Sequence, residues 1–211
     1  MDCPFIASLK ENDREVFLNL HKKFLLEEIT SKSEVIFLGD SLTQFFDKII
    51  FEKYFNKYNA LNFGIYGDKT ENVIFRIENG MFDFLKPKVI VLLIGVNNCN
   101  CTPIDTSKGI FEIINKILKK SPNTKILLLG LLPFSNNIDG FERNYVKSVN
   151  NIIKNYNNNT NIFYLDIGSK FIKNYFIDYE IMPDYLHLSN KGYEIFASSI
   201  VDIIEHLIKL K

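Results

Sequence analysis

The sequence contains few cysteines, and their spacing argues against two kinds of site. Only Cys3, Cys99 and Cys101 occur among its 211 residues. Their odd number and the Cys-Asn-Cys spacing of the close pair match neither a zinc site nor a dithiol redox motif. The sequence therefore predicts three plain reduced thiols.

An excess of charge of either sign is also missing. The chain has 25 basic and 25 acidic residues, which gives a formal net charge of zero. A nucleic acid or an anionic membrane would need Lys and Arg in excess and gathered on one face. The composition therefore predicts a small-molecule partner and no nucleic acid.

Long apolar runs are absent as well, since none approaches the length of a transmembrane helix. The first ten residues, MDCPFIASLK, carry an acid at Asp2 and lack the basic start and apolar stretch of a secretory signal. We therefore expect no membrane insertion and a cytoplasmic location. No linker, repeat or break in composition divides the chain, so a single domain over residues 1–211 is expected.

Five short apolar runs rich in Ile, Val, Leu and Phe alternate with longer segments of helical periodicity. The runs lack strict alternation, as expected when helices cover both faces of a parallel sheet. They predict strands over residues 34–39, 60–64, 88–95, 125–132 and 161–167. Helices are expected over residues 13–29, 43–58, 70–79, 104–120, 140–156 and 190–210. Right-handed crossovers then predict a three-layer α/β/α fold with a five-stranded parallel sheet in the order 2-1-3-4-5.

The turn GDSLT, residues 39–43, follows the first predicted strand and contains Ser41. Ligands of an open parallel sheet bind beyond the carboxyl ends of its strands. A serine at such a turn can have its own backbone N–H and the positive end of a helix beside its hydroxyl. Taken alone, Gly-Asp-Ser also fits an ordinary turn with a good helix N-cap. Its position at the sheet edge favours a nucleophile.

A nucleophilic serine needs a base within hydrogen-bond reach. His21 and His206 lie inside predicted amphipathic helices, where a packed or surface imidazole is the usual explanation, whereas His187 lies in the loop before the last helix. Asp184, in the same loop, can accept from the imidazole and fix its tautomer. The sequence therefore predicts Ser41 as nucleophile and His187 as general base, with Asp184 orienting it.

Acyl transfer develops negative charge on the carbonyl oxygen, which requires preorganised donors. Gly67 follows the second predicted strand, where backbone can approach closely, and Asn97 follows the third and has a neutral amide. Gly67 could instead serve only a positive-φ turn, and Asn97 could only cap the next segment. We expect an oxyanion hole made by the backbone of Ser41, Gly67 and the amide of Asn97, with Asn98 turned toward neighbouring loop backbone.

Five stretches of the chain, in their order and spacing, resemble the GDSL or SGNH hydrolase family. They are VIFLGDSLTQ, NFGIYGDKTENVIFRIENG, PKVIVLLIGVNN, ILLLGLLP and MPDYLHLSNKGYEIFA. Within the family they are most similar to the branch of intracellular platelet-activating-factor acetylhydrolase catalytic subunits and their bacterial relatives. The resemblance spans nearly the entire chain.

The resemblance implies the same site residues as the chemistry above. The family's nucleophile falls on Ser41, its oxyanion donors on Ser41, Gly67 and Asn97, and its base on His187 oriented by Asp184. It further implies a flavodoxin-like sheet, no metal or organic cofactor, and hydrolysis of acetyl or similarly short esters through an acyl-enzyme intermediate. It also suggests a homodimer.

Two departures from the family pattern bear on the substrate. Many members have Asp where this chain has Asn98, although the acetylhydrolase-like branch shares the Asn pair, and the animal subunits have a basic residue where this chain has Phe134. A carbohydrate acetyl ester is therefore as good a candidate as a lipid.

Two functions from other classes remain as alternatives. The same sheet order hosts FMN in flavodoxin-like electron carriers, but Asp40 counts against this because a carboxylate repels a phosphate. The other alternative is a catalytically silent homologue that acts as a scaffold.

Overall fold

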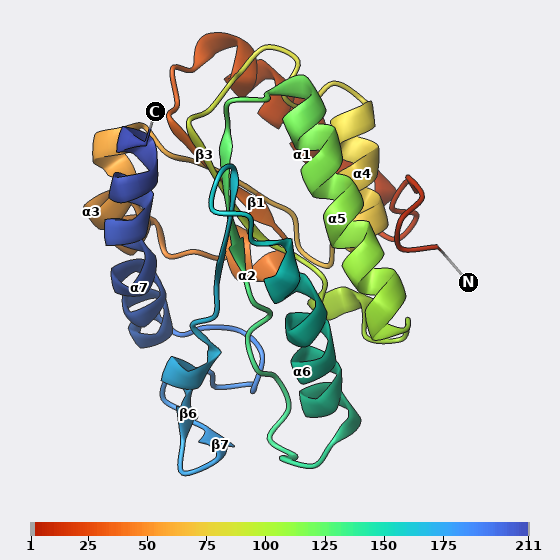
Figure 1. The fold of residues 1–211 in the computed structure, drawn as a ribbon, viewed down its shortest axis with the longest axis vertical. Coiled ribbons are helices and arrows are strands. Elements are labelled where there is room, and N and C mark those ends of the chain that lie inside the picture. The colour runs from red at the N-terminus through yellow and green to blue at the C-terminus, as the bar shows by residue number, and fades with distance from the viewer. Residues whose placement is uncertain (1–2, 211) are drawn as a thin grey trace.

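The central element of the protein is a parallel sheet of five strands in the order β2-β1-β3-β4-β5 (Figure 1). The computed structural model describes residues 3–210, so Asp2 and Lys211, which figure in the predictions above, lie outside the described residues. The strands are β1 (Val35–Gly39), β2 (Leu61–Gly64), β3 (Val89–Leu93), β4 (Lys125–Leu129) and β5 (Ile162–Leu165). The predicted strand order is confirmed.

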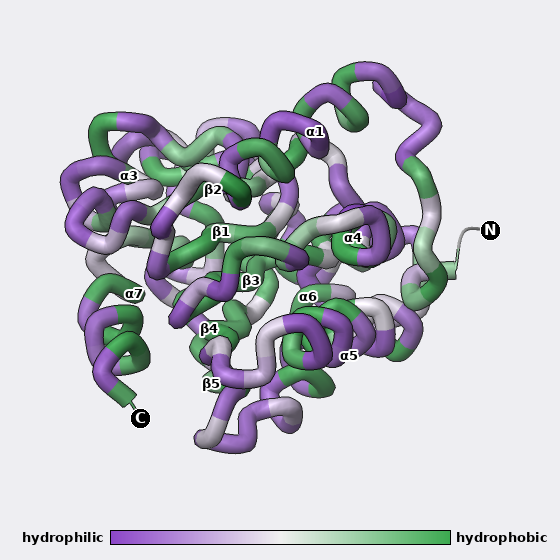
Figure 2. The backbone as a smooth tube through the Cα atoms, turned by 90° about the horizontal axis from the view of Figure 1, so that it is seen from above, coloured by the Kyte–Doolittle hydropathy of each residue, from purple (hydrophilic) through white to green (hydrophobic). Residues whose placement is uncertain are grey.

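Helices cover both faces of this sheet. The longer ones are α1 (Arg14–Thr30), α3 (Lys48–Phe55), α4 (Thr70–Glu78), α5 (Pro103–Lys120), α6 (Phe141–Ile153) and α7 (Asn190–Lys209). Helices α3 and α7 lie together on one side, while α4, α5 and α6 lie side by side on the other, with α1 next to α4 (Figures 1 and 2). The predicted three-layer α/β/α class is confirmed.

The strands are apolar on both faces because both faces are covered. Every residue of β1 and β3 is buried, and the strands form a hydrophobic band between the two helical layers (Figure 2). Burial of this much apolar surface is the main favourable contribution to folding. It also fixes the strand register, so the turns at the carboxyl ends have little freedom to shift.

The predicted helix over residues 43–58 is wrong in one respect, because the chain forms two helices there. A short α2 (Ser41–Gln44) ends before α3 begins, and η1 (Asn56–Tyr58) follows α3. The Asp47 side chain accepts a hydrogen bond from the N–H of Ile50 at 3.0 Å and so begins a new helix. The break also allows Phe46 to turn into the core, where its ring lies 4.5 Å from that of Tyr193.

Several predicted strands extend too far at their carboxyl ends. The apolar runs continue to residues 95, 132 and 167, whereas β3, β4 and β5 end earlier. Ile94 and Leu131 are only 2% and 1% exposed, because the helical layers still cover the chain beyond the last ladder hydrogen bonds. Hydrophobicity therefore reports burial here and not strand pairing.

A small hairpin between β6 (Ile172–Lys173) and β7 (Phe176–Ile177) was not predicted. Its turn residues, Asn174 and Tyr175, both have positive φ, at 50° and 71°. A turn with two positive-φ residues is usually predicted from an Asn-Gly or Gly-Gly pair. Here tyrosine occupies the second position, so the sequence lacks that pattern.

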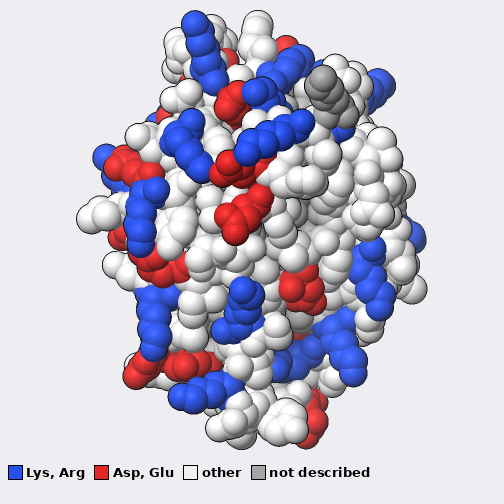
Figure 3. Space-filling view, turned by 60° about the vertical axis from the view of Figure 1, so that its left-hand side comes forward, with Lys and Arg blue, Asp and Glu red and all other residues white. Residues whose placement is uncertain are grey.

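The surface over α3 and α7 carries acidic and basic side chains interspersed (Figure 3). Ion pairs join this part of the surface to α7: Lys53 of α3 lies 2.8 Å from Glu194, and Lys57 of η1 lies 2.9 Å from Glu205. Within residues 3–210, no helix combines the length and the apolar character needed to cross a membrane.

Candidate active site

Three of the predicted site residues follow neighbouring strands at one edge of the sheet. Ser41 comes after β1, while Gly67 comes after β2 and Asn97 after β3. The register aligns the end of β1, Gly39, with the end of β2 on one side and of β3 on the other. The sheet therefore brings the three turns together.

The Ser41 turn is tightly packed. Ser41 is the first residue of α2 and is 3% exposed, and the preceding Asp40 accepts a hydrogen bond from the N–H of Leu42 at 3.0 Å. A Cβ at Gly39 would lie 2.2 Å from the carbonyl oxygen of Leu93, so only glycine fits where β1 enters the turn. Burial raises the pKa of Asp40 to about 7, although the Leu42 N–H works against it.

Asp184 and His187 reach Ser41 from the segment between β7 and α7. The Nε2 atom of His187 lies 3.0 Å from Ser41 Oγ, and its Nδ1 atom lies 2.7 Å from Asp184 Oδ2. With Nδ1 protonated, as a neighbouring carboxylate favours, the ring donates to Asp184 and accepts the serine hydrogen. The structure thus joins the three predicted residues in one hydrogen-bonded relay.

Asp184 is fixed by its own loop. Its Oδ1 atom accepts from the N–H groups of Leu186 at 3.0 Å and His187 at 2.6 Å. Partial burial tends to raise the pKa of Asp184, but the hydrogen bonds from the His187 ring and from the two N–H groups outweigh it and hold the pKa below its ordinary value. The carboxylate therefore stays ionised and can stabilise a protonated imidazole.

Gly67 and Asn97, the other two predicted oxyanion donors, lie in the turns after β2 and β3. Gly67 has a φ of 69°, a conformation that favours glycine. One hydrogen of the Asn97 amide is donated to the carbonyl oxygen of Asp68 at 2.9 Å, which leaves the second hydrogen for another acceptor. Asn98 is buried, and its side chain accepts from the N–H of Thr70 at 3.0 Å, as predicted for the second asparagine.

Two aromatic side chains beside the imidazole were missed in the sequence. The rings of Phe45 and Tyr66 lie 5.7 and 6.5 Å from that of His187, and they are 48% and 52% exposed. Phe45 follows β1 and Tyr66 follows β2 within a few residues. That position was the only feature of the sequence that could have placed them at the site. They give the mouth of the site an apolar rim.

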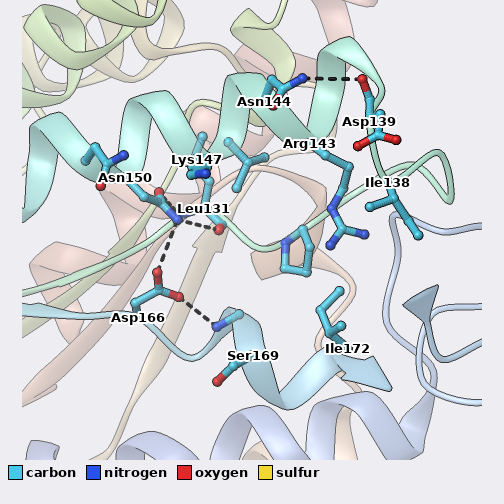
Figure 4. Close-up of a pocket in the computed structure, with 14 residues that line it drawn as sticks. Leu131, Ile138, Asp139, Arg143, Asn144, Lys147, Asn150, Asp166, Ser169 and Ile172 are labelled. Carbon is cyan, nitrogen blue, oxygen red and sulfur yellow. Dashed lines mark hydrogen bonds between the residues drawn. The ribbon is translucent and has the colours of Figure 1, made fainter. Parts of the chain in front are cut away.

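A separate cavity of about 480 Å³ lies beside α6 (Figure 4). Arg143 and Lys147 of α6 reach into it, and Asp166, which accepts from the N–H of Gly168 at 2.8 Å, faces it. Its size would suit a ligand. Among residues 3–210, however, its lining includes none of the five predicted site residues. The candidate active site is therefore the region around Ser41, where the predicted nucleophile and the predicted base meet.

Comparison with protein families matches this fold and site to one of them. Residues 37–195 match the GDSL-like lipase/acylhydrolase family. The chain therefore belongs to this family, as predicted, and is a carboxylic ester hydrolase.

Individual relatives and solved structures agree with the family. The rat platelet-activating factor acetylhydrolase IB subunit alpha2 is 33% identical over 92% of this chain and 85% of its own length. The human subunit alpha1 is 33% identical over 84% of this chain and 78% of its own length. A GDSL-like lipase from Bacteroides thetaiotaomicron shares the fold with a TM-score of 0.73 and 19% identity, over 90% of this chain and 98% of that one. The acetylxylan esterase Axe2 from Geobacillus stearothermophilus has a TM-score of 0.65 and 15% identity, over 87% and 97% of the two chains.

Proposed function

We propose that the protein is a serine esterase that removes short acyl groups, above all acetyl, through a Ser41-Asp184-His187 triad. The observation that carries the proposal is the unbroken relay from Asp184 through His187 to Ser41, with distances of 2.7 and 3.0 Å. The oxyanion donors are the backbone N–H groups of Ser41 and Gly67 and the amide of Asn97.

In the first half-reaction, Ser41 Oγ attacks the ester carbonyl carbon while His187 Nε2 takes the hydroxyl proton. The carbonyl oxygen becomes an oxyanion that accepts hydrogen bonds from the three donors. Its collapse breaks the bond to the alcohol oxygen, which receives the proton from His187, and leaves an acyl ester on Ser41. Water then attacks this ester, again giving its proton to His187, and the second collapse releases the carboxylic acid and restores the Ser41 hydroxyl.

Three observations support a short acyl group. Ser41 is only 3% exposed, so a bulky acyl chain has little access to its hydroxyl. The curated relatives are named acetylhydrolases, and acetylxylan esterases share the fold. For the alcohol half, a lipid and a carbohydrate are both compatible with the apolar rim of Phe45 and Tyr66, which lies where the leaving oxygen takes its proton from His187.

The nucleophile is tested by labelling with a fluorophosphonate. We expect one label per chain, on Ser41, and none on the Ser41→Ala variant, because the reagent reacts with an activated serine hydroxyl. Labelling at another serine would overturn the assignment. A folded protein that takes no label and hydrolyses no ester would favour the scaffold alternative.

The acyl preference is tested with a series of p-nitrophenyl esters. We expect kcat/KM to be at least about tenfold higher for acetyl and propionyl than for octanoyl esters, since a pocket that excludes extra methylenes discriminates by this order. Acetate release from acetylated sugars, lipids and amino-acid derivatives then identifies the alcohol. A preference for long acyl chains would contradict the proposal.

A further inference from the structure

A buried ion pair contacts the turns that carry the candidate oxyanion donors. The Nη2 atom of Arg76, in α4, lies 3.0 Å from Oδ2 of Asp68, and both side chains are 0% exposed. We propose that Arg76 and Asp68 are positioning residues that hold the oxyanion donors in place. This inference rests on the proposed function, because it assigns those donors a task in catalysis.

The guanidinium of Arg76 connects the two turns that carry Ser41 and Gly67. Its Nη1 atom donates to the carbonyl oxygen of Phe63 in β2 at 2.8 Å, and its Nη2 atom donates to that of Gly39, the last residue of β1, at 3.4 Å. The Gly39 carbonyl also accepts from the N–H of Ile65, just past the end of β2, at 3.1 Å. The guanidinium adds a second donor there, so it ties the ends of β1 and β2 to α4 and restrains the points at which the chain leaves both strands.

Asp68 extends the same connection to the third donor. It follows Gly67 in the chain, and its own backbone carbonyl accepts the side-chain hydrogen bond of Asn97 at 2.9 Å. The ion pair with Arg76 restrains Asp68, and Asp68 in turn sets the plane of the Asn97 amide. A displacement of Arg76 would therefore reach the turns of Ser41, Gly67 and Asn97 at once.

Stability alone is a poor explanation for this pair. Burial raises the pKa of Asp68 and lowers that of Arg76, so each charge is costly without the other. Replacing such a pair with apolar residues is often neutral or stabilising. By contrast, an oxyanion donor that moves by a fraction of an ångström loses much of its effect on the rate. The contacts that link the pair to the turns of all three donors favour a role in geometry.

The experiment compares kinetics of Arg76→Lys with those of Asn97→Ala and of the double variant. Lysine keeps the charge but cannot reach two carbonyls and a carboxylate together. We expect Arg76→Lys to lower kcat about 10-fold or more with KM changed less than about 2-fold, as for loss of a contact made only in the transition state. In the double variant, the loss of kcat should be clearly smaller than the product of the two single losses, because the Asn97 contact is part of what Arg76→Lys disturbs.

A second variant keeps the test decisive if Arg76→Lys folds poorly. Arg76→Met combined with Asp68→Leu removes both charges together, so the fold should persist while kcat falls. Glu28→Gln is the matched control, because Glu28 is a buried carboxylate in α1 that accepts from the N–H of Phe82, and kcat should not change.

The outcomes separate this inference from the proposed function. Wild-type kcat in folded Arg76→Lys or in the Arg76→Met/Asp68→Leu variant, or a rate loss that multiplies fully with that of Asn97→Ala, would overturn the positioning role. If Asn97→Ala itself keeps wild-type kcat, the oxyanion assignment fails and the positioning role fails with it. Slow Asn97→Ala with normal Arg76→Lys would leave the esterase proposal intact.

Discussion

The turns after β1, β2 and β3 are buried and tied together by side chains, whereas the segment that carries Asp184 and His187 is largely open to solvent. Ser41 is 3% exposed and Asp68 is fully buried, while the side chain of Asp184 is 57% exposed and that of His187 28%. The segment that carries Asp184 and His187 is joined to the loop after β4 by a hydrogen bond of 2.9 Å from the N–H of Ser135 to the carbonyl of Tyr185. The groups proposed to stabilise charge thus belong to the buried turns after β1, β2 and β3, which we call the frame half of the site. The groups proposed to move a proton, Asp184 and His187, belong to the exposed segment, which we call the loop half.

The largest effect should come from breaking the loop half. His187→Ala should lower kcat by about 10⁴-fold or more, since a triad without its base retains little beyond the oxyanion hole and binding. Steady-state kinetics with p-nitrophenyl acetate as substrate measure this loss.

His21→Ala and His206→Ala are the controls for this change. His21 lies in α1, with Nε2 3.1 Å from the carbonyl oxygen of Asn79, and His206 lies in α7. Both variants should keep most of the activity. An active His187→Ala beside a dead but folded His21→Ala would refute the choice of base.

A smaller effect should separate the two adjacent asparagines of the frame half. Asn97→Ala should lower kcat by about 10²–10³, roughly 3–4 kcal/mol of barrier, with little change in KM. Asn98→Ala should instead lower the free energy of unfolding by about 1–3 kcal/mol, because it leaves the buried Thr70 N–H without its acceptor and removes one of the donors to the Glu71 carboxylate.

The two asparagine variants are compared by kcat and by thermal midpoint. If Asn98→Ala suffers the larger loss of rate while Asn97→Ala stays active, the oxyanion assignment is off by one residue.

The smallest effect concerns stability and has opposite signs in the two halves. The pKa of Asp40 is raised from 3.8 to about 7, so the folded state binds a proton more tightly and stability falls as pH rises across that window. Asp40→Asn should therefore match the wild type near pH 4 and exceed it above pH 7 by about 1–3 kcal/mol, since one pKa unit corresponds to about 1.4 kcal/mol.

Asp184→Asn should show the reverse. The pKa of Asp184 is lowered, so its contribution is present above the ordinary value of 3.8 and disappears as pH falls through the folded pKa. The loss at neutral pH should stay below about 1 kcal/mol, because an exposed carboxylate is screened by solvent. Thermal melts of both variants at acidic and at neutral to alkaline pH test the pair, and equal signs would contradict the contrast.

The sheet and the position of its turns could be predicted from the sequence, whereas the details of the helices between the strands could not. Apolar runs without alternation predicted the sheet, and sheet order then placed the turns of Ser41, Gly67 and Asn97 at one edge. The break after α2 depends on the hydrogen bond by which the Asp47 side chain caps a new helix. Hydrophobic periodicity carries no information about such a cap. The role inferred for Arg76 was invisible because a charged residue in a helix normally faces solvent.

Three sequence predictions stay predictions. They are the single domain over residues 1–211, the homodimer and the cytoplasmic location. The site roles also await the kinetic tests above, although the relay of Ser41, His187 and Asp184 has the expected geometry.

The packing of α7 against α2 has a consequence for how the protein is made. The hydroxyl of Tyr193 in α7 donates to the carbonyl of Leu42 at 3.1 Å, so the last helix docks beside the serine turn. A chain emerges from the ribosome amino end first, and early segments fold before late ones. If His187 is the base, the nascent polypeptide contains its serine for most of translation without the group that activates it. Esterase activity would then begin only when α7 packs against the rest of the protein, and incomplete translation products would hydrolyse no ester.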